Sequence, residues 1–423
     1  MNKRPNVIVV GGGVIGCWTA WHLLQRGCDV TLVERDTIGS GASSGNCGYI
    51  CPSHVHPLCG PGAVINGLRT MAKFGGALSI PPRWDPTLWR WLWQFAKHCN
   101  ANDFHQASLA RHAILQSSRQ QYSQFAALHA ANIQWQEKGL LLVYRSDRDF
   151  QAYEASVDEL RREFEIQVDQ YDAKQICQLE PTVRDDLAGG WHFPGDAHLS
   201  PVKLLQQLLS EIKNAGGVIR QHTPIIGLRF DGRQLSSIQT DGGESLAADA
   251  FVFTTGAESD TLGRQLGINL PIVPGKGYSV TIGNAEGMPT TPMIFEDDHV
   301  AVTPLGESFR IGSTMQLTGF SRSLPPHRIE LLKRSARRHL RLPLPVGPET
   351  QWTGWRPMMA DGVPCIDRSP RAANAYIAAG NGMIGMATAP ATGKLVAELA
   401  LSITPHIDPH PYRARRFNNT DKS

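Results

Sequence analysis

The feature that most constrains this chain is a glycine pattern near its start, Gly11-x-Gly13-x-x-Gly16. The apolar run at residues 6–10 predicts a buried parallel strand before it, and the apolar positions over 14–26 predict a helix after it. In such a pattern the first glycine permits a tight turn, the second lets the backbone approach a pyrophosphate, and the third lets the helix pack on the strand. The segment therefore predicts a dinucleotide-binding unit.

The next strand, expected at residues 30–33, ends at an acidic side chain. Glu34 follows Gly16 by 18 residues, and its carboxylate can accept hydrogen bonds from the ribose hydroxyls of an adenosine. The helix that begins at Val14 and Ile15 offers free N–H groups and a positive dipole end to phosphates. Arg35 comes next and is a further candidate contact, although a solvated or structural role is the simpler interpretation. The motif alone does not separate FAD from NAD.

Length and charge restrict the class of protein further. With 423 residues the chain is too long for one simple core, which favours two connected domains. Lys and Arg number 41 against 38 Asp and Glu, so no basic stripe is expected and a nucleic-acid partner is not favoured. Because no run of 18 or more apolar residues occurs, we expect no transmembrane helix.

The N-terminus and the cysteines bear on the compartment. The basic residues near the start precede a short β-branched strand and a glycine turn, which is a folded element and not a signal peptide. We therefore expect a cytoplasmic protein, with a peripheral position on the inner face of the membrane as the alternative. Cys47, Cys51 and Cys59 lie near His54 and His56, but their spacing matches no zinc or iron–sulfur pattern. Free thiols and no metal are expected.

The rest of the chain alternates between helical and extended patterns. Helices are expected at 104–132, 153–165, 201–215 and 327–340, and strands at 140–143, 218–221, 225–229 and 251–253. Residues 276–315 predict several antiparallel strands. A tryptophan-rich stretch at 86–98 has Trp91 on the opposite side from Trp89 and Trp93, and packing between domains is favoured there over contact with a membrane surface.

Two further segments are candidate cofactor loops. Residues 39–48 combine glycines with Ser43, Ser44 and Asn46, which suits a loop lying along a cofactor but equally a surface turn. Near the C-terminus, a strand at 375–379 leads into a cluster of glycines at 380–385 and then a helix. Backbone N–H groups there, supported by the helix dipole, are placed to meet the edge of a flavin ring.

At these residues the chain resembles the D-amino-acid oxidase superfamily of FAD-dependent oxidoreductases. Within it, the likeness is greatest to bacterial D-amino-acid dehydrogenases, including those that act on D-hydroxyproline, and it runs from the first strand to about Phe417. Besides the glycine motifs, it rests on Glu180-Pro181, Gly189-Gly190 with Asp196, Thr255-Gly256-Ala257, Pro274-x-Lys276-Gly277-Tyr278-Ser279, Arg310-Ile311-Gly312-Ser313, Gly354-Trp355-Arg356-Pro357 and Asp361-Gly362-x-Pro364.

The resemblance implies a role for individual residues. Arg356 corresponds to the arginine that binds the substrate carboxylate, and Tyr278 is a candidate for orienting the substrate, a half-buried sheet tyrosine being an equal alternative. Relatives more often have histidine at Asn381, and those that attach flavin to cysteine do so at the position of Gly354, so non-covalent FAD is implied. The implied cofactor contacts are Gly11, Gly13, Val14, Ile15, Gly16, Glu34, Arg35, Ser43, Ser44, Asn46, Gly48, Ile225, Gly256, Gly380, Gly382, Met383, Ile384 and Gly385.

The resemblance also implies a fold and a domain division. It predicts an α/β protein with a Rossmann-like FAD-binding domain on a parallel sheet and a substrate domain of helices with a mainly antiparallel sheet. The FAD-binding domain is expected to be discontinuous, at 1–60, 196–258 and 348–417. The substrate domain is expected at 61–195 and 259–347.

The implied activity is the oxidation of the C–N bond of a small amino acid, a D-amino acid such as D-proline or D-hydroxyproline. Hydride passes from the α-carbon to flavin N5, and a membrane quinone or a partner subunit accepts the electrons. A flavin oxidase that uses O2, like glycine or sarcosine oxidase, is the first alternative. A non-catalytic FAD-binding subunit is the second, against which Arg356 and both glycine clusters argue. An FAD enzyme acting on modified tRNA is disfavoured by the charge balance.

Overall fold

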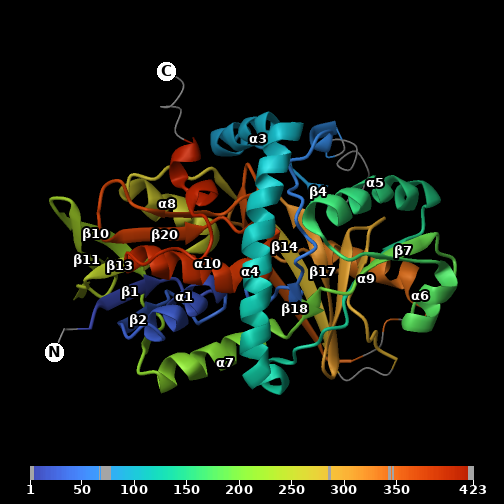
Figure 1. Ribbon diagram of the computed structural model, residues 1–423, viewed down its shortest axis with the longest axis horizontal. Helices are drawn as coiled ribbons and strands as arrows, with labels where there is room; N and C mark the ends of the chain where they lie inside the picture. The colour runs from blue at the N-terminus through green and yellow to red at the C-terminus, as the bar shows by residue number, and fades with distance from the viewer. Residues whose placement is uncertain are drawn as a thin grey trace.

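The computed structural model describes residues 4–65, 67, 78–283, 287–341, 344 and 347–417. Two sheets stand side by side with helices around them, and the long helix α4 (Ala101–Ile133) crosses between them (Figure 1). The expected α/β fold class, with one mainly parallel and one mainly antiparallel sheet, is confirmed.

The first sheet contains the predicted dinucleotide-binding unit. Its strand order is β19-β20-β13-β1-β2-β9, and every neighbouring pair is parallel except β19 with β20. The central strand β1 (Asn6–Val10) is buried because it is covered on both faces, which explains its continuous run of apolar residues. The other strands are β2 (Asp29–Val33), β9 (Val218–Arg220), β13 (Ala250–Phe253), β19 (Cys365–Arg368) and β20 (Ala375–Ala379).

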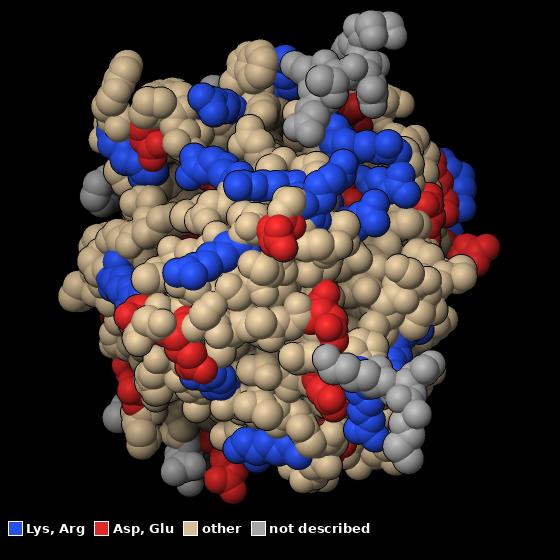
Figure 2. Space-filling view, turned by 90° about the vertical axis from the view of Figure 1, so that its left-hand side faces the viewer, with Lys and Arg blue, Asp and Glu red and all other residues tan. Residues whose placement is uncertain are grey.

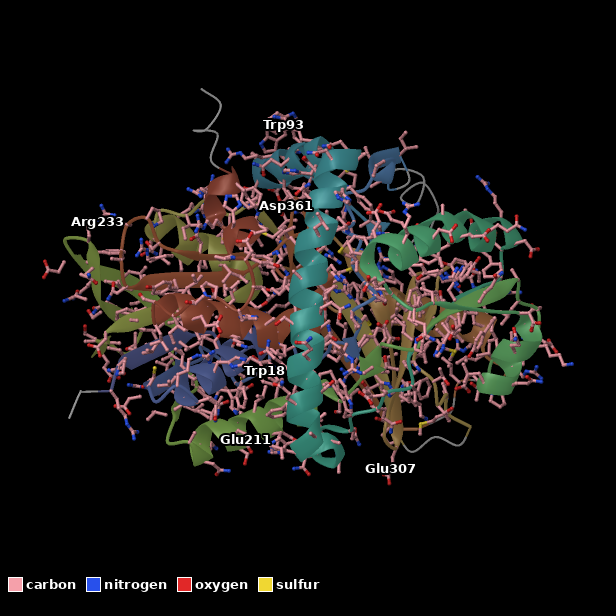
Figure 3. The ribbon with its side chains drawn as sticks, viewed as in Figure 1. Trp18, Trp93, Glu211, Arg233, Glu307 and Asp361 are labelled. Atoms are coloured by element: carbon pink, nitrogen blue, oxygen red, sulfur yellow. The ribbon has the colours of Figure 1, made fainter. Side chains whose placement is uncertain are left out.

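Helices cover one face of this sheet. The helix α1 (Val14–Leu24) packs closely against α10 (Gly385–Ala400). Gly393 permits this close approach, because a Cβ there would lie 2.7 Å from the backbone nitrogen of Thr19. Trp18 is fully buried where α1 meets α4 (Figure 3). The opposite face is covered by a small three-stranded sheet. The remaining elements here are α7 (Pro201–Asn214), α8 (Ser259–Gln265), β10 (Ile225–Asp231), β11 (Gln234–Thr240) and β12 (Ser245–Leu246).

The second sheet is larger and mainly antiparallel. Its strand order is β18-β14-β17-β16-β15-β5-β7-β6, with β4 (Leu78–Ser79) pairing to β17. One face packs on α9 (Pro326–His339) and the other turns toward the first sheet. Its strands are β5 (Leu140–Tyr144), β6 (Asp169–Tyr171), β7 (Gly189–Phe193), β14 (Ile272–Gly283), β15 (Met293–Phe295), β16 (Val300–Leu305), β17 (Ser308–Gln316) and β18 (Glu349–Met359).

Smaller elements complete the fold. Helices α5 (Asp147–Phe164) and α6 (Ala173–Leu179) lie at the far end of the second sheet (Figure 1), and β3 (Tyr49–Ile50) pairs with β8 (Ala197–His198). The expected return to the FAD-binding domain at residue 348 lies just before β18, and β18 pairs with β14 in the second sheet. We therefore propose that the chain returns to the FAD-binding domain only after Met359.

The tryptophan-rich stretch forms helix α3 (Pro86–His98), capped by Asp85. Trp91 packs inward and its indole nitrogen donates to the carbonyl of Met358 at 2.9 Å, as expected for packing between segments. The same expectation is wrong for Trp89 and Trp93, which are 58% and 57% exposed. Figure 3 shows Trp93 projecting from α3 at the edge of the molecule. The helical period separates these rings from Trp91, so within the described residues only the face of α3 that carries Trp91 is covered.

Surface charge is less even than the composition implied. The face in Figure 2 carries an interrupted band of Lys and Arg side chains across its upper part and mixed charges below. A near-balanced total does not determine where charges lie, so this local band could not be expected from the counts. Among the described residues, no helix combines the length and apolar character that a membrane crossing needs.

Candidate functional site

A single large cavity brings the predicted motifs together. Its volume is about 2280 Å³, and its lining includes Gly13, Glu34, Met383 and Arg356 from four separate segments of the chain. Pockets for ordinary small ligands measure roughly 300–1,000 Å³. The cavity therefore has room for a dinucleotide cofactor and a small substrate together.

The first glycines form the turn that the sequence predicted. Gly11 has φ of 110°, and a Cβ there would lie 2.6 Å from the carbonyl oxygen of Thr254. A Cβ at Gly16 would lie 1.8 Å from the carbonyl oxygen of Gly11, so Gly16 serves the packing of α1 and does not border the cavity. Gly13 differs, because it borders the cavity and its Cβ would meet only the Ser43 hydroxyl, at 3.4 Å. The space at Gly13 is therefore open for a phosphate.

Glu34 is held at the cavity wall at the end of β2. Its two carboxylate oxygens accept the backbone N–H groups of Gly12 at 2.6 Å and Asp36 at 2.9 Å. These bonds fix the carboxylate close to the N-terminus of α1. In a bound dinucleotide the adenosine ribose lies there, next to the pyrophosphate. Arg35 borders the cavity as well, but its guanidinium pairs with Glu258 at 2.5 Å, which supports the structural interpretation. Ile225 and Gly256 complete this end of the lining.

The second loop crosses the face of the large sheet. Ser43 and Asn46 border the cavity, and the Ser43 hydroxyl accepts the N–H of Val14 at 2.9 Å. Arg310 fixes the loop from β17 by donating to the carbonyl oxygens of Ser44 at 2.7 Å and of Asn46 at 2.5 Å. Ser44 and Gly48, predicted as cofactor contacts, do not border the cavity.

The backbone conformation at Gly48 itself requires a glycine. It has φ of 79°, and a Cβ there would lie 2.1 Å from the carbonyl oxygen of Leu199. In the structure both residues shape the loop: the Ser44 carbonyl accepts from Arg310, and Gly48 provides the positive φ. Their sequence signal, small residues in a glycine-rich stretch, is the same for shaping a loop as for contacting a cofactor.

The C-terminal glycines lie at the start of α10 and border the cavity from Gly380 to Gly385. Within them, Asn381 is only 4% exposed, and its amide nitrogen donates to the hydroxyls of Thr388 at 3.0 Å and Thr392 at 2.9 Å. These bonds tie the loop to the helix. They explain how a neutral amide is accommodated at this buried position.

Arg356 reaches the cavity from β18. It pairs in register with Gly275, and its guanidinium lies against Gly277, where a Cβ would come within 2.6 Å of the guanidinium carbon. One of its nitrogens donates to the carbonyl oxygen of Thr314 at 3.2 Å. Burial lowers the pKa of Arg356, although a guanidinium stays charged near neutrality. Among the described residues no carboxylate lies within ion-pair distance, so the charged fork is open toward the cavity.

Tyr278 also borders the cavity, but its side chain does not share the position of Arg356, although Tyr278 is the neighbour of Gly277 on β14. Successive residues of a strand point to opposite faces, so Tyr278 faces α9 and packs in the apolar core there. It is 1% exposed, and its hydroxyl hydrogen-bonds to the Gln316 side-chain amide. This geometry favours the sheet-tyrosine alternative for the Tyr278 side chain. The Arg356 guanidinium instead lies against Gly277, which the sequence offered only as part of a motif and without a role in the site.

One cluster of potential metal ligands lies beside the cavity. Cys51, His54 and Asp196 place one ligand atom each within 4.8 Å of the others, the only such group in the described part of the chain. The Asp196 carboxylate already accepts the hydroxyl of Ser53 at 2.6 Å and its N–H at 3.2 Å. Burial raises the pKa of Asp196 to about 7 and lowers that of His54 to about 4. These bonds give the carboxylate a structural role, and the absence of a metal stays a prediction.

The likeness to known proteins agrees with this site. A family model for FAD dependent oxidoreductases, the DAO family, matches residues 6–399. A D-amino acid dehydrogenase of Methylobacterium radiotolerans is 30% identical over 408 residues, which cover 95% of this chain and 97% of that protein. Another from Agrobacterium fabrum is 29% identical, over 97% of this chain and 99% of its own length.

Solved structures show the same fold. Glycine oxidase from Geobacillus kaustophilus superposes with a TM-score of 0.78 at 23% identity, covering 98% of this chain and 99% of that one. L-proline dehydrogenase from P. horikoshii gives 0.72 at 18% identity, covering 99% and 98%. The open turn at Gly13, the fixed Glu34 and the glycine loop before α10 fit an extended dinucleotide such as FAD. The chain belongs to the DAO family of FAD-dependent oxidoreductases.

Proposed function

We propose that this protein oxidises the C–N bond of a small D-amino acid, proline-like substrates included, to an imino acid or cyclic imine. One observation carries the proposal. Arg356 presents an unpaired guanidinium, within the described residues, to the cavity that the cofactor motifs line. A guanidinium fork matches a carboxylate bidentately. The preference for the D-enantiomer is supported by relatives named D-amino acid dehydrogenase.

In this proposal the protein orients the substrate, and FAD, when bound, would supply the hydride acceptor. Arg356 holds the carboxylate, and the Thr314 carbonyl and the surface of Gly277 fix the guanidinium in turn. Trp355 and Phe320 also border the cavity and contact each other edge to face, with ring centroids 5.3 Å apart. Because Arg356 is desolvated, its charge attracts a substrate carboxylate more strongly than it would in open water. Orientation and electrostatics suffice, and no general base is assigned.

For the electron acceptor we propose a membrane quinone or a partner subunit in place of O2. The relatives that are named dehydrogenases support this. Trp89 and Leu92 of α3 border the cavity, and Trp89 and Trp93 also face solvent, which gives an apolar acceptor a surface to approach. The position that follows for the protein is cytoplasmic, with peripheral contact at the inner face of the membrane. The oxidase alternative would instead yield stoichiometric hydrogen peroxide.

The assay that tests the proposed function is turnover of paired D- and L-amino acids with an artificial electron acceptor. We expect D-proline and related D-amino acids to be oxidised faster than their L forms. We also expect NAD to accept no electrons, because the dinucleotide fingerprint that is completed by an acidic residue, Gly11 to Glu34, is the one assigned to FAD. Equal or faster turnover of the L forms would overturn the enantiomer assignment.

Gly277→Ala provides a second test, one that moves the guanidinium without deleting it. The added methyl group would lie 2.6–2.8 Å from three atoms at the flexible end of Arg356, so the guanidinium must shift while the backbone can stay. We expect a raised KM for amino acids, by about tenfold, with flavin content and melting temperature close to those of the parent. Gly227→Ala is the matched strand control, because its Cβ would meet only ordinary contacts, at 3.7 Å and beyond. An unchanged KM in Gly277→Ala would show that the guanidinium position is unimportant.

A further inference from the structure

The cavity continues past Arg356 across the strands of the large sheet. Ser313 and Met315 on β17 border it, as do Ala301 on β16 and Ile294 on β15. Strand register places these side by side, because Ala301 pairs with both Gly312 and Ile294. We call this part of the cavity the trough. Apolar side chains share its lining with Tyr49, whose hydroxyl is already engaged because it donates to the carbonyl oxygens of Met293 at 2.7 Å and Val302 at 2.9 Å.

The far end of the trough is acidic. Glu296 follows β15 directly, borders the cavity and is 25% exposed at its side chain. Its ion-pair contact within the described residues is His299, at 3.7 Å, which is too long for a hydrogen bond. The two acids after it are engaged elsewhere: Asp297 accepts backbone N–H groups, and Asp298 pairs with Arg338 and His339. The Glu296 carboxylate therefore retains capacity to accept hydrogen bonds from a ligand.

The length of the trough restricts what can use both ends. The Arg356 guanidinium lies over Gly277 on β14, and β15 is three strands further along the sheet. At ~4.8 Å per strand, the two strands are roughly 14 Å apart, and the side chains shorten the gap at each end. A side chain as short as that of alanine or proline does not reach Glu296, whereas an extended chain of several methylenes does.

We propose that the trough is a specificity site for D-amino acids with a long cationic side chain, such as D-lysine or D-arginine. The carboxylate lies on Arg356, the methylenes lie over Met315, Ala301 and Ile294, and the terminal cation binds Glu296. Each part of the ligand meets its chemical complement: a cation, an apolar floor and an anion. The proposal rests on the proposed oxidation of D-amino acids and adds the substrate class.

D-norleucine is the matched substrate for the test, because its unbranched chain ends without a charge. We expect the parent protein to oxidise D-lysine with about ten- to a hundredfold higher kcat/KM than D-norleucine, the range for one hydrogen bond to a charged group. Glu296→Gln should remove most of that advantage while leaving D-norleucine and D-proline within about twofold of the parent. Glu307→Gln is the control, since Glu307 is exposed at a hairpin end away from the cavity (Figure 3).

The outcomes separate the two proposals. If D-norleucine and D-proline are oxidised but D-lysine has no advantage in the parent protein, the specificity site is wrong and the proposed function stands. If Glu296→Gln slows all three substrates equally with flavin content unchanged, Glu296 has a general role and the specificity site is again wrong. If no D-amino acid is oxidised, the proposed function itself fails.

Discussion

Replacing Arg356 with alanine is expected to lower kcat/KM for amino acids by about thirty- to several-thousand-fold, while FAD stays bound. The loss of a partner for a buried charge costs about 2–5 kcal/mol, and about 1.4 kcal/mol corresponds to each factor of ten. FAD should be retained because the residues proposed to hold it, Gly13, Glu34 and the loop at 380–385, border the cavity from other segments. Steady-state kinetics with flavin content measured on each preparation checks the expectation.

Arg356→Lys distinguishes geometry from charge. Lysine keeps the positive charge but presents no planar fork, so we expect most of the defect to persist. Arg322→Ala serves as the control, because Arg322 also borders the cavity but is exposed and lies 5.6 Å from the ring of Trp355. It should change kcat/KM little. Near-normal turnover by Arg356→Ala with full flavin content would show that another group binds the carboxylate.

Replacing Gly13 with valine should abolish FAD binding without preventing folding. Gly13 has φ of −74° and ψ of 178°, an extended conformation that valine adopts readily. The branched side chain would point into open cavity space, since a Cβ there meets only the Ser43 hydroxyl at 3.4 Å. It would therefore occupy the place of the phosphates. We expect a colourless, folded protein, and absorbance at flavin wavelengths together with circular dichroism checks both parts.

The same substitution at neighbouring glycines should behave differently. Gly11→Val and Gly16→Val drive a side chain into backbone at 2.6 Å and 1.8 Å, so these variants should fail to fold. Gly195→Val is the control that should change neither colour nor fold, because Gly195 is exposed with nothing within 4 Å of its Cβ. A yellow Gly13→Val protein with normal FAD content would contradict the placement of the phosphates.

Local sequence was sufficient to predict the unit from β1 to β2, because each step there has a signal of its own. The apolar run, the three glycines and Glu34 each correspond to one physical requirement of the turn. The first residue of α5 was harder to predict from the sequence. It begins at Asp147, before the predicted 153, because Ser146 caps it with an exposed first turn that shows little apolar pattern.

Which face a side chain occupies was harder to predict. Tyr278 and Gly277 differ by one position on β14, and only the pairing with β18 and the packing of α9 decide which of them meets Arg356. Trp89 and Trp93 were expected to be covered, but both stay more than half exposed, and the Lys97 ammonium that lies over Trp93 comes from α3 itself. Glu296 carries no local motif, and it joins the site only because the strand order brings β15 to the edge of the cavity.

The central claim, that this protein oxidises D-amino acids with bound FAD, is tested most directly by anaerobic mixing with a D-amino acid while flavin absorbance is recorded. Without oxygen or another acceptor, a substrate that donates hydride must bleach the flavin in a single turnover. The account predicts bleaching by D-proline or D-lysine that is faster than by the L forms and is lost in Arg356→Ala. A flavin that stays oxidised with every D-amino acid, or that L-amino acids bleach as fast or faster, would contradict it.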